Sequence, residues 1–333
     1  MEGSQGPPQA SGVREPKPQP VCPGRAFGTV APAEAPVPVR THRQGRALVM
    51  AITSPDRREP ISLTPVDQRC LAALSLEAYR TLSCRQMGDV FFTSQSACQR
   101  RLEELRSLGL VRRLFLPDVV DLSRSEAVYT LSPRGAVALG QQVRSERPFL
   151  TRSSGRTQLF LKHAVRINDF RIALEKAVAA NRLSLPYWLS DWQLRPFSLK
   201  RPGTWPEPKL TFYPDAYFAI DRPSRREYFF LEMDLGTMPL RAIRNKLLAF
   251  IAFHRAGQHQ LLFLIDSFRV LLVTVGQRRM ERMMDLLRDI GRCPNMFMFS
   301  ALPRDFGERV PSPSIITEPV WHRCNESEPF PLL

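Results

Sequence analysis

Apolar residues recur at a helical spacing in three consecutive segments of the first half of the chain. The first segment, 63–79, opens on a Thr-Pro-x-Asp motif that is typical of a capped helix start. The next two, 85–92 and 94–108, place apolar residues three and four positions apart, and Gly109 follows as a helix-ending residue. The pattern predicts three short helices in succession.

Two short apolar runs, 110–117 and 127–131, follow these helices and are separated by a polar loop. We expect them to form a two-stranded ribbon, with a further helix at 133–143 after Ser132. Three helices followed by a ribbon are typical of a winged helix-turn-helix domain. The alternative is a three-helix interaction module with a solvated basic face.

In a winged helix the third helix enters the major groove of DNA, and its N-terminal half meets the base edges. Glutamine and arginine contact adenine and guanine with two hydrogen bonds, and basic residues of the wing contact phosphates. The candidate DNA-binding residues are Ser94, Gln95, Ser96, Gln99, Arg100 and Arg101 on the third helix, and Arg112, Arg113 and Arg124 on or near the ribbon. The pattern therefore predicts double-stranded DNA as a partner.

The second half of the chain alternates helical and extended patterns. The predicted elements are an amphipathic helix at 156–182, a turn at 183–194, strands at 211–220 and 227–234, a helix at 241–257, strands at 260–266 and 270–275, a helix at 278–291 and a strand at 296–300. This order predicts an α/β (α+β) fold class, in which helices cover a mixed sheet.

Length and charge add a domain division and a partner class. The chain has 333 residues, enough for two domains, and its formal net charge of +15 is typical of proteins that meet nucleic acid. We divide it into a proline-rich arm expected to be disordered (1–62), a winged helix (63–143), an α/β domain (144–303) and a proline-rich tail (304–333). No apolar run approaches the ~18 residues that span a bilayer, and no signal-peptide core is present, so we expect a cytoplasmic protein without a membrane partner.

Three carboxylates stand at the ends of two predicted strands. Asp215 begins one apolar run, and Glu232 and Asp234 end the next. Alternate residues of a strand point to the same face, so Glu232 and Asp234 share a face, and a hairpin would bring Asp215 close to both. Carboxylates gathered at one sheet edge are typical of a divalent-metal nuclease site or of the remains of one.

Several motifs resemble known groups of proteins. The order helix, strand with Pro-Asp, strand with Glu-x-Asp, helix and strand is similar to the PD-(D/E)xK, or restriction-endonuclease-like, core. Residues 63–300 resemble the replication-relaxation family of plasmid and mobile-element proteins, through the segments LTPVDQR, RRLEELRSLGLVRR, YTLSPRG, HAVRINDFRIAL, WLSDWQL, YPDAYFAI, FLEMDLGT and NKLLAF. This resemblance implies a bacterial DNA-binding protein of plasmid replication, mobilisation or relaxation. It also implies a relaxase or replication initiator as a partner, and a homodimer.

The nuclease resemblance also assigns residues. It implies metal ligands, here for Mg²⁺, at Asp215 and Glu232, with a further ligand at Glu175 on the preceding helix. Asp234 stands where the nuclease pattern has the lysine that polarises the attacking water. Lys246, on the next helix, is the candidate to supply the missing cation.

We therefore expect a protein that reads duplex DNA through its winged helix and assembles a replication or relaxation complex, without catalysis and without a required cofactor. One alternative is a Mg²⁺-dependent DNA nickase with Asp215, Glu232 and Lys246 as its site. The other is a winged-helix transcription regulator whose α/β half only dimerises or senses a ligand.

Overall fold

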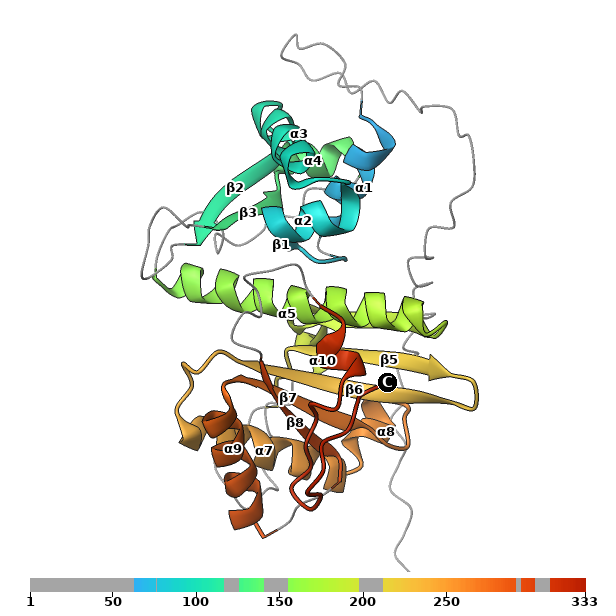
Figure 1. The fold of residues 1–333 in the computed structure, drawn as a ribbon, viewed down its shortest axis with the longest axis vertical. Helices are drawn as coiled ribbons and strands as arrows, with labels where there is room; N and C mark the ends of the chain where they lie inside the picture. The colour runs from blue at the N-terminus through green and yellow to red at the C-terminus, as the bar shows by residue number, and fades with distance from the viewer. Residues whose placement is uncertain are drawn as a thin grey trace, which may run out of the picture. The chain divides into compact units, whose positions relative to one another are not determined.

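The computed structural model describes residues 63–75, 77–116, 126–140, 155–197, 212–291, 295–302 and 312–333. The predicted arm at 1–62 lies outside these ranges. The described chain is a mixed α/β structure with a three-stranded sheet in its first part and a five-stranded sheet in its second part (Figure 1). No helix within the described ranges is both long and apolar enough to cross a membrane.

Short, capped helices and three strands make up the first part. The elements are α1 (Pro65–Ala73), β1 (Thr81–Ser83), α2 (Cys84–Phe91), α3 (Gln95–Ser107), β2 (Val111–Leu116), β3 (Glu126–Leu131) and α4 (Pro133–Ala138). A serine or threonine stands at the N-cap of each helix, where its side chain accepts a hydrogen bond from a backbone N–H of the first turn. Gly109, at φ 72°, ends α3 in the left-handed conformation that the sequence predicted.

The predicted ribbon has a third strand. β3 pairs antiparallel with both β1 and β2, in the order β1-β3-β2. β1 has only three residues between two helices, so it lacks the alternation over several positions that reveals a strand in a sequence. Helix α1 also ends at Ala73, earlier than the predicted 79.

The second part is built on a mixed five-stranded sheet. Its elements are α5 (Gly155–Ala180), β4 (Ser184–Ser190), α6 (Asp191–Leu194), a 3-10 turn (Arg195–Phe197), β5 (Ala216–Arg222), β6 (Arg225–Asp234), α7 (Leu240–Arg255), α8 (Gln258–Phe263), β7 (Arg269–Val275), α9 (Gln277–Asp289), β8 (Phe297–Leu302) and α10 (Ser314–Thr317). The strand order is β4-β5-β6-β7-β8; the pairs β4–β5 and β5–β6 are antiparallel, and the pairs β6–β7 and β7–β8 are parallel.

Two predictions in this part are wrong. Residues 184–190 form strand β4, where a turn was expected. The apolar run 260–266, predicted as a strand, instead forms the end of helix α8 and the residues after it, and Leu261 and Leu264 in it are 71% and 87% exposed. The period of a short, continuous apolar run does not distinguish a strand from a helix, because every position in it is apolar.

The five-stranded sheet separates two hydrophobic cores. Phe218 and Phe229 lie in the core that also holds residues of α5, whereas Tyr217 and Phe230, their neighbours along β5 and β6, lie in the core formed with α7 and α9. This alternation follows from the two-residue period of a strand. Because both faces are covered, the central strands are buried along most of their length.

The described part of the predicted tail, 312–333, packs against the sheet. Trp321 is fully buried, and its indole N–H donates to the carbonyl of Ile315 at 2.7 Å. The backbone of His322 bridges to Phe299 of β8. The sequence predicted that this segment is loose or wraps the surface. In the structure its aromatic and aliphatic residues complete the core on the α5 side of the sheet.

Helix α5 is buried on more than one side. Phe170 and Leu174 belong to the core of the five-stranded sheet, Ile172 belongs to the core of the first part, and Val165 packs with residues of β2 and β3. The sequence predicted a one-sided amphipathic helix that placed Leu159 on the core side, but Leu159 is 55% exposed. A helix that is apolar on several sides is typical of a buried position.

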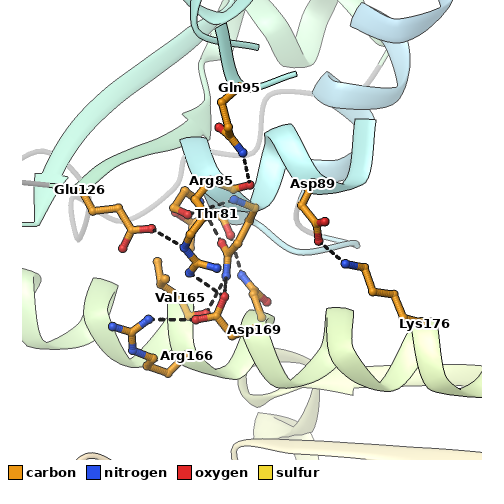
Figure 2. A network of polar contacts seen from close by, with 12 residues as sticks. Thr81, Arg85, Asp89, Gln95, Glu126, Val165, Arg166, Asp169 and Lys176 are labelled. Atoms are coloured by element: carbon orange, nitrogen blue, oxygen red, sulfur yellow. Dashed lines mark hydrogen bonds and ion pairs between the residues drawn. The ribbon is translucent and has the colours of Figure 1, made fainter. Parts of the chain in front are cut away.

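A polar network joins α5 to α2 (Figure 2). The carboxylate of Asp169 has no exposed surface and accepts hydrogen bonds from Arg85 at 2.8 Å and Gln86 at 2.7 Å. Arg166 is the third donor, at 2.9 Å. The Gln86 amide also donates to the carbonyl of Val165 at 2.8 Å. Since a buried carboxylate is tolerated only when it is paired and hydrogen-bonded, these contacts fix the position of α2 on α5.

Replacing Asp169 with alanine should be strongly destabilising. The substitution leaves Arg85, Gln86 and Arg166 without their shared acceptor, so we expect the free energy of unfolding to fall by about 3–5 kcal/mol. Urea denaturation of the full chain measures this loss. The matched control is Asp285→Ala on α9, where the Asp285 side chain is 63% exposed and pairs with Arg288 at 2.7 Å; we expect it to cost less than about 1 kcal/mol. Similar losses in both variants would contradict the proposed role of Asp169.

Candidate functional site

Three of the predicted DNA-contacting residues are free on the surface of α3. Ser96, Gln99 and Arg100 are exposed, and among the described residues none makes a hydrogen bond or an ion pair with their side chains. Residues three and four positions apart lie on the same side of a helix, so these three form one polar face near the N-terminal end of α3.

Three other predicted DNA-contacting residues, in α3 or at its N-cap, make contacts within the protein. Ser94 is the N-cap residue, and the Gln95 amide donates to the backbone carbonyl of Arg85 at 3.0 Å. The Arg101 guanidinium donates to the carboxylate of Asp67, with Nε at 2.6 Å. Burial would raise the pKa of Asp67, but Arg101 outweighs burial and lowers it. Arg101 therefore serves the structure by neutralising a buried aspartate of α1.

Strand β2 presents one free arginine and one paired arginine. Arg112 is exposed on β2 and has no partner among the described residues. Arg113 pairs with Glu103 of α3 at 3.0 Å and lies 5.2 Å from the ring centroid of Phe115. Phe115 on β2 is 54% exposed, an aromatic side chain that sequence reasoning did not single out. Arg124 lies outside the described residues.

The carboxylates of β5 and β6 meet a lysine of α7. The backbone N–H of Asp215 donates to the carbonyl of Leu231 at 3.0 Å, which places Asp215 next to Glu232 across the antiparallel pair. The ammonium of Lys246 donates to Glu232. Asp215, Glu232 and Lys246, which the sequence grouped, therefore lie together at one end of these strands, and both carboxylates are buried.

A histidine that the sequence reasoning did not assign to this group completes the cluster. His163 Nε2 lies 2.7 Å from the carbonyl oxygen of Met233 and 3.3 Å from Asp215 Oδ2. Both partners are acceptors, so Nε2 carries a proton and donates it. Burial lowers the pKa of His163, but the Asp215 carboxylate outweighs this effect and raises it to about 9. His163 is therefore an imidazolium at neutral pH, and with Lys246 it holds the pKa of Asp215 well below its usual range against the effect of burial.

The pKa values of Glu232 and Lys246 are both raised, for different reasons. Burial raises the pKa of Glu232 to about 7, although Lys246 opposes this shift. Burial lowers the pKa of Lys246, but Glu232 and Asp215 outweigh burial and raise it. Because the ammonium faces several carboxylates, the charged lysine is the form that the geometry favours, and it pairs with Glu232 wherever Glu232 is ionised.

Two other predicted ligands have different partners. Asp234 accepts hydrogen bonds from the Thr274 hydroxyl at 2.6 Å and from the guanidinium of Arg279. Glu175 accepts a hydrogen bond from the phenol of Tyr79, in the turn before β1. The contacts of Glu175 thus secure the first part of the chain to α5, and no described contact joins it to Asp215.

The residues present do not fit a divalent metal. Mg²⁺ requires a near-octahedral set of oxygen ligands, whereas Asp215, Glu232 and Asp234 are neutralised by His163, Lys246 and an arginine. The His163 N–H occupies the space toward which the Asp215 carboxylate and a backbone carbonyl converge. Within the described ranges, no group of three or more His, Cys, Asp or Glu side chains is arranged to hold a metal ion.

His163 should stabilise the fold in a pH-dependent way. Its pKa in the folded protein, about 9, lies above the ordinary 6.5, so its contribution is complete below about pH 6.5 and is lost as the pH rises through 9. We expect His163→Gln to cost on the order of 2 kcal/mol at pH 6, an amount reduced by solvent screening of the partly exposed side chain. Because His163 also lowers the pKa of Asp215 and of Glu232, the difference between the two proteins reports the loss of His163 together with its coupling to these carboxylates.

Urea denaturation of wild type and His163→Gln between pH 6 and 9.5 measures this difference. His322→Gln, a change to a histidine outside the cluster, is the control. A His163→Gln difference that stays constant over this range would contradict the ion pair with Asp215.

Comparisons with known proteins gave one match. A search of curated proteins found no match, and a search of solved structures found none. The model of the family described as replication-relaxation matches residues 74–262, which is more than half of the chain. The matched region runs from the end of α1 into α8, so it contains the exposed face of α3 and the cluster around Asp215. The chain belongs to the replication-relaxation family, which indicates a role in the replication or relaxation of plasmid or mobile-element DNA.

Proposed function

We propose that this protein binds double-stranded DNA through a winged helix formed by residues 63–140, as a non-catalytic component of a replication or relaxation complex. The element order α1-β1-α2-α3-β2-β3 and the sheet order β1-β3-β2 support a winged helix. In this arrangement α3 is the recognition helix, and the β2–β3 hairpin is the wing.

The free polar face of α3 is the observation that carries this proposal. Ser96, Gln99 and Arg100 are exposed without internal partners, whereas Gln95 and Arg101 beside them are bonded within the fold. Gln99 and Arg100 have the chemistry for two-bond contacts to adenine and guanine. The net charge of +15 supports attraction to a polyanion.

We further propose that the α/β part is a restriction-endonuclease-like scaffold that does not cleave DNA. The element order α5-β4-β5-β6-α7-β7-α9-β8, with an antiparallel hairpin that continues into parallel strands, supports the fold. The pairing of every carboxylate in the cluster supports the absence of cleavage, because no free ligand set remains for a catalytic metal. The partners that fit this role are a relaxase or replication initiator and a second copy of the chain.

Base contacts and phosphate contacts should be separable by mutation. We expect Gln99→Ala and Arg100→Ala each to weaken binding to the specific site by about 1–3 kcal/mol while hardly changing binding to random duplex. Arg112→Ala should weaken both alike and reduce the salt dependence of binding by about one counterion. Fluorescence anisotropy with a selected site and a scrambled duplex measures these effects.

Arg282→Ala is the matched control for charge. Arg282 is an exposed arginine on α9, so its substitution removes the same charge from a different part of the chain. If Gln99→Ala and Arg100→Ala lose affinity equally on all duplexes, α3 does not read bases. If Arg282→Ala matches Arg112→Ala, the wing makes no special phosphate contact.

Cleavage is tested on supercoiled plasmid with Mg²⁺ or Mn²⁺. We expect wild type and the nearly isosteric Asp215→Asn to show the same background nicking, because Asp215 and Glu232 already form ion pairs with His163 and Lys246. Near-UV circular dichroism confirms that the variant is folded. Metal-dependent nicking by wild type that is lost in Asp215→Asn and Lys246→Met would overturn this view and establish a nickase centred on these residues.

A further inference from the structure

A pocket of about 230 Å³ lies beside the charged cluster. Its walls come from residues 79–81 at the start of β1, from the part of α5 between Phe160 and Asn168, from residues 190–192 at the β4–α6 junction, and from Tyr213 with Asp215. The pocket thus joins segments that are far apart along the chain. Its lining shares no residue with the exposed face of α3.

Arg80 is held in an unfavourable conformation at this pocket. Its φ of 66° lies in the left-handed region, which favours glycine, and its Nε is buried without a hydrogen-bond partner among the described residues. Asn168 on α5 fixes the turn by donating to the carbonyls of Tyr79, at 3.3 Å, and Thr81, at 2.5 Å. A strained residue that its surroundings hold in place, with an unused donor, is typical of a binding site.

Aromatic side chains line the pocket without joining the core. Phe160, Trp192 and Tyr213 are half-buried, and none belongs to a hydrophobic core cluster of the described chain. The indole N–H of Trp192 is buried and has no hydrogen-bond partner among the described residues. Arg80 lies over the ring of Phe160 at 5.6 Å. The pocket therefore offers flat apolar surfaces together with unused N–H donors.

The charges that line the pocket balance. Arg80 and His163 are cationic, and Asp191 and Asp215 provide carboxylates. Asp215 is paired with His163 at 3.3 Å, and Asp191 lies 3.9 Å from the guanidinium of Arg195. A matching ligand is planar and aromatic and carries hydrogen-bond acceptors and donors on its edge, which is the chemistry of a nucleobase.

We propose that this pocket binds one unpaired nucleotide, with the base stacked on the aromatic walls and its edge hydrogen-bonded by Arg80 and Trp192. The volume of about 230 Å³ has room for one base and is too small for a base pair. A base reaches such a pocket only when it is out of a duplex, so the ligand is a nucleotide of a single strand or a free mononucleotide. This inference goes beyond duplex reading and uses different residues.

The test uses the full chain and a pentanucleotide with 2-aminopurine at its centre. At moderate salt, which screens non-specific backbone binding, we expect 2-aminopurine fluorescence to be quenched on binding. The same strand with a central abasic site should bind at least about fivefold more weakly, as expected for one stacked base. 2-Aminopurine nucleoside monophosphate as a probe distinguishes the two sources: binding equal to that of the strand indicates a free nucleotide, and weaker binding indicates a strand.

Two matched variants separate binding from folding. Phe160→Ala should weaken binding about fivefold or more, whereas Leu159→Ala, a change to the exposed neighbour on α5, should leave it unchanged. Arg80→Gly removes the donor but suits a positive φ, so affinity should fall while the melting temperature does not.

Equal binding of the abasic strand, or a fall in melting temperature without loss of affinity in Arg80→Gly, would overturn the proposal. Gln99→Ala should bind the pentanucleotide normally, so a failure of duplex reading is distinguishable from a failure of this site.

Discussion

The buried carboxylate of Asp169 is the interaction on which the described structure most depends. It lies on α5, a helix that contributes apolar residues to the core of the five-stranded sheet and to the core of the first part. A helix in such a position has no face for an unpaired charge, so the donors from α2 and from α5 itself must be in place for the fold to form. Figure 2 shows how this network ties the helix before α3 to α5.

The buried carboxylates of the charged cluster at β5 and β6 are also paired with cationic side chains. Asp215 and Glu232, which the nuclease resemblance assigned as metal ligands, are buried, and His163 of α5 and Lys246 of α7 supply the positive charge beside them. The cations are thus part of the chain. A site that is neutralised internally holds its geometry without metal, and it leaves the adjacent pocket with a balanced set of donors and acceptors. This internal neutralisation is the observation behind our proposal that this part of the chain does not cleave DNA.

Much of the element order could be predicted from the sequence because it rests on local signals. The N-caps at Thr64, Ser83 and Ser132 and the glycine after α3 are short-range features, and most long elements follow from hydrophobic period. The errors fall where local signals are weak. β1 is too short to show alternation, and the apolar run of α8 fits a strand or a helix equally well. The pairing of Asp215 with Glu232 was predictable because both lie on one hairpin.

By itself, the sequence determined the family and the grouping of Asp215, Glu232 and Lys246. It also predicted short helices with a β-ribbon in the first half and alternating helices and strands in the second half. Only the tertiary structure decided which polar residues are free and which are occupied. Arg101 and Glu175 have the chemistry for DNA and metal contacts, but Asp67 and Tyr79 hold them, and His163 joins a carboxylate far from it along the chain. The physical reason is that a charged side chain takes the partner that burial brings to it, and burial is set by how distant segments pack.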